Sequence, residues 1–543
     1  MKRLIYLLIA VLFTVNSIAQ TNLELAEQAI ENEDYAAVIR YTTEHLQTTP
    51  KVAEALAMRA SAYVYIGDLP NAFADINAAI KCWNKKTKSI TLSQLYIFRA
   101  FLYQNIDDNV AALADLNTAV NNGKKVAENY EMRADFYREQ AEYALAEADY
   151  RTAAQLEPTN ADYQIEIGRC MLHQQKYDNA KSYFQKLVKL YPNNEEALRL
   201  YAVTFLCKED YRAFIDSYIE YMEMAQNPDL QPLYEAAQYE FAYTIKAVSE
   251  QVTSASDNYY WLSVRARLYR EHRQFTEALA DLKQVEVGLD TVQNPFVLSE
   301  IAFCYDELDN FSQSVFYYTK LIDLYEQRNV PNDVFYLKRS IAYRELGEYD
   351  KTIADCDKAL TISMDYAGYA YYLRGLAHEL AKDNDAAFDD YNKSILFDEN
   401  YAYSYLMRGE QYLIHRQDTI HAMQDFEHIL ELDTIGTDGS CRHYALMFLG
   451  KTDEAKAWMA QILEAEPNNA GHYYDAACLY ARMGEADEAM NFLRQAFELG
   501  FRRFHHLEAD DDMDNLRNRQ DYKDLVNQYK KEKLTNLLKN LES

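Results

Sequence analysis

Histidines gather between residues 415 and 472, and their side chains are those best suited to bind a metal ion. The group comprises His415, His421, His428, His443 and His472, with Cys441 among them. Zinc sites use short, regular spacings of His and Cys, and these intervals match none of them. We therefore interpret the group as surface residues of an acidic helical protein and predict no metal site. His505-His506 is assigned to the C-terminal segment on the same grounds.

Gly450-Lys451-Thr452 has the composition that ends a phosphate-binding loop. Such a loop needs an earlier glycine, where this sequence has Ala445, and a preceding strand, which the sequence does not predict here. The patterns of serine hydrolases, zinc proteases and dinucleotide-binding turns do not occur either. We therefore predict no catalytic residue, no cofactor and no enzymatic activity.

The chain is acidic and poor in residues that form tight turns. Its 543 residues include 55 Lys and Arg against 85 Asp and Glu, which gives a formal net charge of −30. Proteins that bind nucleic acid concentrate Lys and Arg on one surface, so this balance argues against DNA or RNA as a partner. Only 14 Gly and 9 Pro occur. This low content indicates long helices rather than strands joined by turns.

The N-terminus has the features of a secretory signal peptide. Lys2 and Arg3 precede an apolar run from residue 4 to residue 15, and small residues including Ala19 follow it. The run is too short to span a bilayer, and no later run is long enough, so we expect no integral membrane span. We predict cleavage of residues 1–19 after Ala19 and a periplasmic or secreted protein. A retained N-terminal anchor is the alternative.

Seven cysteines are scattered through the sequence without a CxxC pair or a short-spaced framework. This distribution is typical of small buried residues. Because an exported chain can form disulfides, a single bridge between Cys441 and Cys478 stays open as an alternative.

A period of 34 residues runs through the chain, as Arg374, Arg408 and Arg442 illustrate. Within each unit a small residue at position 8 lets two helices approach closely, and an aromatic residue at position 11 fills the space above it. A glycine at position 15, such as Gly347, ends the first helix. The clearest unit reads YLKRSIAYRELGEYDKTIADCDKA, residues 336–359. This spacing resembles that of the tetratricopeptide-repeat family, in the form exported by bacteria and closed by a C-terminal cap.

The resemblance implies an all-α, right-handed superhelical solenoid of helix-turn-helix repeats. About thirteen units start near residues 19, 53, 93, 127, 161, 195, 259, 295, 333, 368, 402, 436 and 470. Residues 228–258 have a helical pattern but no turn, so we interpret them as a degenerate repeat or hinge. They separate an N-terminal block, residues 20–227, from a C-terminal block, residues 259–503.

Residues 504–543 resemble the capping segment that follows many bacterial arrays of this kind. The last repeat of a solenoid exposes an apolar face, and a cap must cover it. The apolar residues expected to do so are Phe501, Phe504, Leu507, Leu516, Tyr522, Leu525 and Val526.

An arginine at position 7 occurs together with an aspartate at position 23. The pairs are Arg59/Asp75, Arg99/Asp115, Arg133/Asp149, Arg265/Asp281, Arg339/Asp355, Arg374/Asp390 and Arg408/Asp425, and Arg442/Trp458 breaks the rule. Because units without the arginine also lack the aspartate, we predict a charge-assisted bridge between the two helices of one unit. These residues are therefore structural and are not candidates for a binding site.

In this family positions 2, 5, 9, 12 and 13 line the concave groove. In the units from 333 to 469 these positions form an apolar and aromatic stripe, which marks a binding site on a surface that should be wet. The predicted ligand-groove residues are Leu337, Ile341, Tyr369, Tyr372, Leu376, Tyr403, Leu406, Tyr444, Met447 and Phe448. The alternative is that contacts between units, or self-association, bury the stripe.

The family's carboxylate clamp needs Asn at position 9, where this chain has residues such as Ile341 and Leu376. The ligand should therefore be apolar or aromatic in character. We expect a non-catalytic scaffold or adaptor of the bacterial cell envelope, with one or more proteins as partners. A glycan- or cell-wall-binding module that uses the groove aromatics is the alternative.

Overall fold

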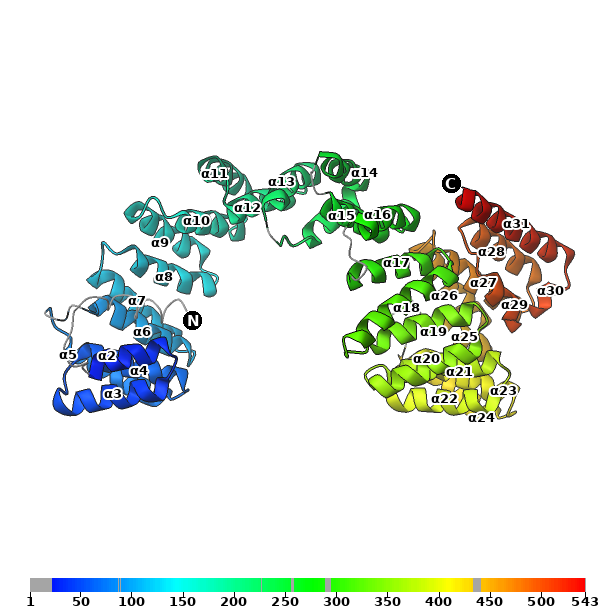
Figure 1. Ribbon diagram of the computed structural model, residues 1–543, viewed down its shortest axis with the longest axis horizontal. Helices are drawn as coiled ribbons and strands as arrows, with labels where there is room; N and C mark the ends of the chain where they lie inside the picture. The colour runs from blue at the N-terminus through cyan, green and yellow to red at the C-terminus, as the bar shows by residue number, and fades with distance from the viewer. Residues whose placement is uncertain are drawn as a thin grey trace. The chain divides into compact units, whose positions relative to one another are not determined.

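The computed structural model describes residues 22–542, apart from residues 86, 88, 226, 255–257, 289–293 and 433–440, and describes side chains up to residue 532. The predicted signal peptide and its cleavage site lie outside these residues. Every regular element in the described part is a helix (Figure 1). None of the described helices is long and apolar enough to cross a membrane. The chain divides into two units, Met1–Ala247 and Val248–Ser543, with a boundary inside residues 228–258.

The first unit consists of six antiparallel helix pairs and the start of a longer helix. The pairs are α2 (Asn22–Glu31) and α3 (Tyr35–Thr48), α4 (Ala53–Tyr65) and α5 (Leu69–Cys82), α6 (Leu92–Gln104) and α7 (Asn109–Asn122), α8 (Ala127–Glu139) and α9 (Tyr143–Leu156), α10 (Ala161–His173) and α11 (Tyr177–Leu190), and α12 (Glu195–Leu206) and α13 (Tyr211–Met224). The longer helix is α14 (Gln231–Ser254), whose backbone is non-helical at Glu240.

The second unit consists of seven further pairs and a C-terminal cap. The pairs are α15 (Tyr259–Glu271) and α16 (Phe275–Gly288), α17 (Pro295–Glu307) and α18 (Phe311–Gln327), α19 (Asp333–Glu345) and α20 (Tyr349–Ile362), α21 (Ala367–Leu380) and α22 (Asn384–Phe397), α23 (Ala402–Ile414) and α24 (Thr419–Leu432), α25 (Arg442–Phe448) and α26 (Thr452–Ala465), and α27 (Ala470–Arg482) and α28 (Ala486–Glu498). The cap comprises α29 (Phe504–Ala509), the 3₁₀ helix η1 (Asp511–Met513), α30 (Asp514–Arg517) and α31 (Gln520–Glu542). The helical repeat solenoid expected from the sequence is confirmed, with its units in the expected register.

The turn between the two helices of a repeat requires a left-handed residue at position 15. Gly67 and Gly347 adopt φ of 79° and 74° there, and repeats without glycine force the same conformation on other residues, such as Asp309 with φ of 53°. Aspartate commonly follows as the N-cap of the second helix. Asp68 and Asp108, for example, each accept a hydrogen bond from the backbone N–H three residues on.

The core of a repeat forms where the small residue at position 8 meets an aromatic ring. At Gly168 a Cβ atom would lie 2.3 Å from the ring of Phe184, and at Gly409 it would lie 2.6 Å from the ring of Phe426. These rings come from the second helix of the repeat, near position 24. The helices can approach this closely only because the glycine leaves room for the ring.

The predicted arginine–aspartate bridges are confirmed in all seven repeats that carry both residues. In α8 and α9, Arg133 Nε lies 2.7 Å from Asp149 Oδ2, and Nη2 lies 2.8 Å from Oδ1. The Arg133 side chain is 19% exposed and that of Asp149 9%. Two parallel charge-assisted hydrogen bonds in a partly buried position hold the two helices of the repeat together.

The same arginines also bind the preceding repeat, a contact that the sequence pattern did not reveal. Arg133 Nη1 donates to Asn117 Oδ1 at 2.7 Å, and the corresponding acceptor is Thr43 for Arg59 and Ser249 for Arg265. In each case the acceptor is a short polar side chain at position 25 of the preceding repeat, on its second helix. Because Ser249 lies in α14, the second half of α14 takes the place of a second repeat helix. This supports the interpretation of residues 228–258 as a degenerate repeat.

Arg442, the exception in the sequence, replaces the bridge with two other contacts. Its guanidinium lies 5.1 Å from the ring centroid of Trp458, which occupies the place of the aspartate. Its Nη1 donates to the carbonyl of Leu430 in the preceding repeat, at 3.1 Å. A cation–π contact therefore substitutes for the ion pair.

The cap covers the apolar face of the last repeat, as predicted. Leu507 and Leu516 are fully buried, and Phe501, Tyr522, Leu525 and Val526 are at most 8% exposed. They share one hydrophobic cluster with residues of α27 and α28, to which Met513 also belongs.

Candidate functional site

Four tyrosines form an aromatic cluster on α21 and α23, in the region of the predicted groove. Tyr369 and Tyr372 lie on the first turns of α21, Tyr403 on the first turn of α23, and Tyr401 just before it. The ring centroids of Tyr372 and Tyr401 are 5.0 Å apart, and those of Tyr401 and Tyr403 are 5.9 Å apart. Tyr369 is 36% exposed. Tyr401 was missed because it precedes the first helical position of its repeat.

Leu337 and Leu406 do not belong to this surface, and their assignment to the ligand groove was wrong. Each is 4% exposed and packs into the hydrophobic core between neighbouring repeats. A side chain buried to that degree offers no area to a ligand. For these two positions the structure bears out the alternative that contacts between units bury the stripe.

Tyr444, Met447 and Phe448 lie against the last repeat and the cap. Tyr444 packs against the cluster that includes the cap residues, and burial raises the pKa of its hydroxyl well above the usual value. Phe448 stacks on Phe426 at 4.6 Å and is covered by the guanidinium of Arg482, 5.0 Å from its centroid. Other side chains of the same chain therefore cover part of the surface of these three residues. Ile341 and Leu376 are half-buried on α19 and α21.

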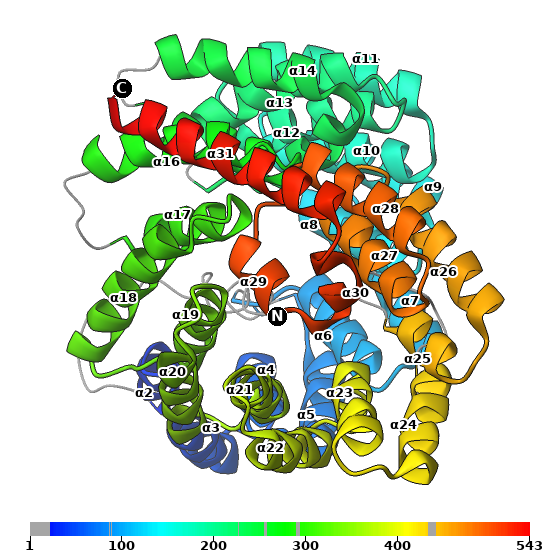
Figure 2. The same ribbon diagram turned by 90° about the vertical axis from the view of Figure 1, so that its right-hand side faces the viewer.

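The first part of the cap turns back onto earlier repeats of the second unit. Asp309, in the turn before α18, accepts hydrogen bonds from the backbone N–H of Arg502 at 3.2 Å and from Arg503 Nε at 3.0 Å. The ring of His505 lies against Gly347 and the ring of Tyr349. In Figure 2, α29 and α30 lie inside the curve formed by the repeats of this unit.

At the C-terminal end of this first part of the cap, acidic side chains pair with basic side chains of the repeats. Asp511 lies 3.6 Å from Lys382 Nζ, in the turn after α21, and both side chains are exposed. Asp512 pairs with Arg482 Nε, and Arg482 Nη2 lies 2.7 Å from Glu410 on α23. The residues Arg502 to Asp512, which we call the inner segment, thus contact the turns that follow α17, α19 and α21.

A buried carboxylate lies beside the inner segment. Glu345 is 5% exposed, and its Oε1 pairs with Arg344 at 2.7 Å. Burial alone would raise the pKa of Glu345, but the positive charges of Arg344, His506 and Arg503 lower it below the usual value. Glu345 therefore stays ionised and favours basic side chains at this end of the inner segment.

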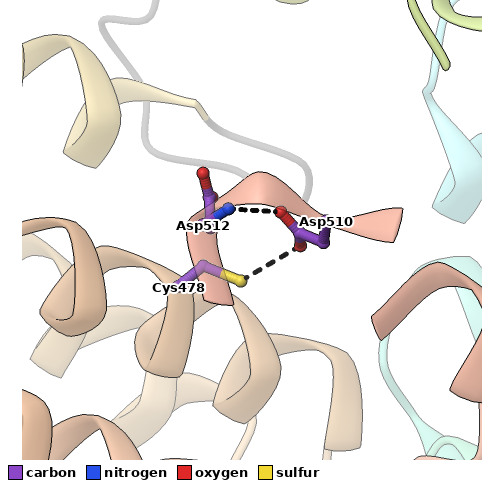
Figure 3. A group of neighbouring side chains, drawn as sticks. All are labelled: Cys478, Asp510 and Asp512. Atoms are coloured by element: carbon purple, nitrogen blue, oxygen red, sulfur yellow. Dashed lines mark hydrogen bonds between the residues drawn. The ribbon is translucent and has the colours of Figure 1, made fainter. Parts of the chain in front are cut away.

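Cys478, Asp510 and Asp512 bring potential metal ligands within 4.8 Å of one another (Figure 3). The Cys478 thiol donates to Asp510 Oδ2 at 3.5 Å, and the backbone N–H of Asp512 donates to Asp510 Oδ1 at 3.0 Å. Burial raises the pKa of Cys478, so the thiol keeps its proton, and Arg482 already neutralises Asp512. A cation would have to compete with a fixed guanidinium, so the group fits a structural role.

The remaining chemically suggestive residues are dispersed or enclosed. None of the seven cysteines forms a disulfide, so the alternative bridge between Cys441 and Cys478 is absent from the described part of the chain. His421 is exposed and pairs with Asp418 three residues before it, whereas His443 is buried between helices. The interpretation of the histidines as surface residues therefore fails for His443.

Comparison with known proteins places the repeats in a family. Two sequence models described as "Tetratricopeptide repeat" match residues 137–205 and residues 444–469 and 472–499. The rat "DnaJ homolog subfamily C member 3" is 23% identical over 218 residues, 37% of this chain and 42% of that protein. The Arabidopsis thaliana "Hsp70-Hsp90 organizing protein 3" is 23% identical over 209 residues, 35% of this chain and 34% of that protein.

The chain thus spans less than half the length of either curated relative. Among solved structures, the C-terminal part of a repeat protein from Cytophaga hutchinsonii is 15% identical, and the match covers 51% of this chain and 98% of that one with a TM-score of 0.35. The matched sequence models thus identify tetratricopeptide repeats in residues 137–205, 444–469 and 472–499, and the other described helix pairs of the chain have the same helix-turn-helix form.

Proposed function

We propose that the protein is a non-catalytic scaffold of the bacterial cell envelope that binds a segment of a partner protein. Tetratricopeptide repeats generally mediate contacts between proteins, and both matching sequence models describe such repeats. The signal-peptide pattern of residues 1–19 supports export to the periplasm or the outside of the cell. N-terminal sequencing of the mature protein should find Gln20 as the first residue.

The observation that carries the proposal is the tyrosine cluster of α21 and α23. Its rings contact one another and are held on rigid helices, so they lose little conformational freedom when a ligand binds. Tyr369 offers more than a third of its surface to a partner. Partly exposed aromatic anchors of this kind supply much of the energy of protein interfaces.

Site-specific photocrosslinking tests this site. A photoreactive phenylalanine at position 369 should crosslink a defined protein in envelope extract, whereas the same residue at position 239 serves as a matched control. Tyr239 is also exposed, at 67%, but lies on α14 in the first unit and is not a member of the cluster. The crosslink at 369 should weaken when Tyr372→Ala is added. Equal crosslinking at both positions would contradict the assignment of the site.

The same rings could stack on sugars, which is the alternative function. It predicts retention of the protein on purified, protein-free cell-wall material, with loss of retention in Tyr369→Ala. Retention there without a specific protein crosslink at 369 would favour the glycan-binding module over the protein scaffold.

A further inference from the structure

The inner segment, Arg502–Asp512, joins elements that are far apart in sequence through polar contacts. Arg503 and Asp309 are separated by 194 residues. The apolar residues around the segment face the other way, because Phe501, Leu507 and Met513 pack with α27 and α28. The segment is therefore anchored firmly to the last repeat and more weakly to the turns after α17, α19 and α21.

The inner segment contacts these turns with basic groups at its N-terminal end and with acidic groups at its C-terminal end. At the basic end, the Arg503 guanidinium pairs with Asp309, which also accepts from the backbone N–H of Arg502, and Glu345 lies close by. At the acidic end, Asp511 meets Lys382. The turns thus recognise the side chain of one arginine, Arg503, and that of one aspartate eight residues later, Asp511.

The strength of this contact is limited by its exposure. The Arg503 side chain is 44% exposed, although its partner Asp309 is only 10% exposed, and Lys382 and Asp511 are 70% and 73% exposed. Ion pairs of this kind contribute little in water. The inner segment can therefore leave the turns at low cost, while its apolar side keeps the cap on the last repeat.

We propose that the inner segment is a built-in ligand, and that an external protein segment with a basic residue eight positions ahead of an acidic one competes with it for these turns. The proposal rests on the proposed function, in that it names a partner chemistry for the second unit. It also assigns a surface distinct from the tyrosine cluster. Positions 2 and 15 of a repeat helix are about 20 Å apart along its axis, so the two surfaces lie toward opposite ends of the first helices.

The test uses a fluorescent peptide of residues 500–514, GFRRFHHLEADDDMD, and full-length protein. Arg503→Ala with Asp511→Ala weakens the internal ligand and leaves the turns intact. The peptide should bind this variant on the order of fivefold more tightly than it binds the wild type, because internal competition is reduced. Adding Asp309→Asn and Lys382→Ala removes the receiving groups and should abolish the gain. A peptide with its Arg and Asp residues exchanged is the control and should not bind.

Equal peptide affinity for the wild type and the Arg503→Ala/Asp511→Ala variant, or no binding to either, would overturn the proposal. So would a gain that survives Asp309→Asn and Lys382→Ala. A measurement on the wild type alone guards against misfolded variants. Saturating peptide should accelerate hydrogen exchange of residues 504–509, and unchanged protection there would mean that the inner segment is a permanent plug. Crosslinking at position 369 is read out separately, so failure of this inference and failure of the proposed function can be told apart.

Discussion

Removal of Arg133 should loosen its own repeat and the joint to the repeat before it. The side chain makes three hydrogen bonds, two to Asp149 and one to Asn117. Each hydrogen bond to a charged group contributes about 1.5–3 kcal/mol. The partial exposure of Arg133 reduces the combined contribution of its three bonds toward the value of a single strong one. We therefore expect Arg133→Ala to lower the local free energy of opening by about 2–3 kcal/mol.

Double-mutant cycles separate the two contacts. Asp149→Ala should cost about 2–3 kcal/mol by itself, because it leaves a half-buried guanidinium without its partner, and the double variant should cost little more than either single change. Asn117→Ala should cost about 1 kcal/mol and should have almost no further effect once Arg133 is gone.

The assay must be local, because repeat arrays do not unfold in a single step. Native-state hydrogen exchange of peptides from α8 and α9 reports the opening of this repeat. Arg151→Ala is a control, since Arg151 lies on α9, is 44% exposed, pairs with Glu147 one turn away and otherwise lies 6.0 Å from the ring centroid of Tyr183. It should cost less than about 0.5 kcal/mol. Additive losses for Arg133→Ala and Asp149→Ala would refute the reasoning.

Three further predictions concern packing and pH. Gly168→Ala should destabilise its repeat by about 1–3 kcal/mol, as measured by native-state hydrogen exchange of α10 and α11, because the added methyl group collides with the ring of Phe184. Leu406→Ala should lower the local free energy of opening by about 2–4 kcal/mol, whereas Tyr369→Ala should lower it by less than about 1 kcal/mol; equal losses in hydrogen exchange of α21 and α23 would place Tyr369 in the core. Burial lowers the pKa of His443 to about 3, so the unfolded chain binds one more proton between that value and about 6.5. Stability should therefore fall as the pH drops through this interval, and melting curves of His443→Phe should show a flatter dependence.

The sequence by itself determined the repeats, their register and the pairs inside them. Because the units serve as their own alignment, the joint occurrence of Arg133 with Asp149 and of Arg374 with Asp390 identified contacts within a repeat, which are local in space as well as in sequence. The apolar face of the cap could also be predicted from the sequence, because Leu507 and Leu516 need a surface that covers them and the last repeat exposes one.

Other contacts could not be predicted from the sequence, because the type of residue at the contacting position varies from repeat to repeat. Asn117, Thr43 and Ser249 all accept a hydrogen bond from the arginine of the following repeat, but they share only a short polar side chain. Nor could position alone separate Leu406, which is buried, from Tyr372, which is half-buried, since both lie at position 5. Their exposure depends on how closely neighbouring repeats pack.

Only the tertiary structure brought Arg503 to Asp309. No periodicity links these residues, because their meeting depends on the rotation that accumulates over the intervening repeats of the second unit. Each repeat contributes a small angle that depends on packing against its neighbours, and the sum decides which distant turns the cap can reach. The sequence therefore specified the individual repeat, and the stacking of repeats decided that this unit closes on its own C-terminal segment.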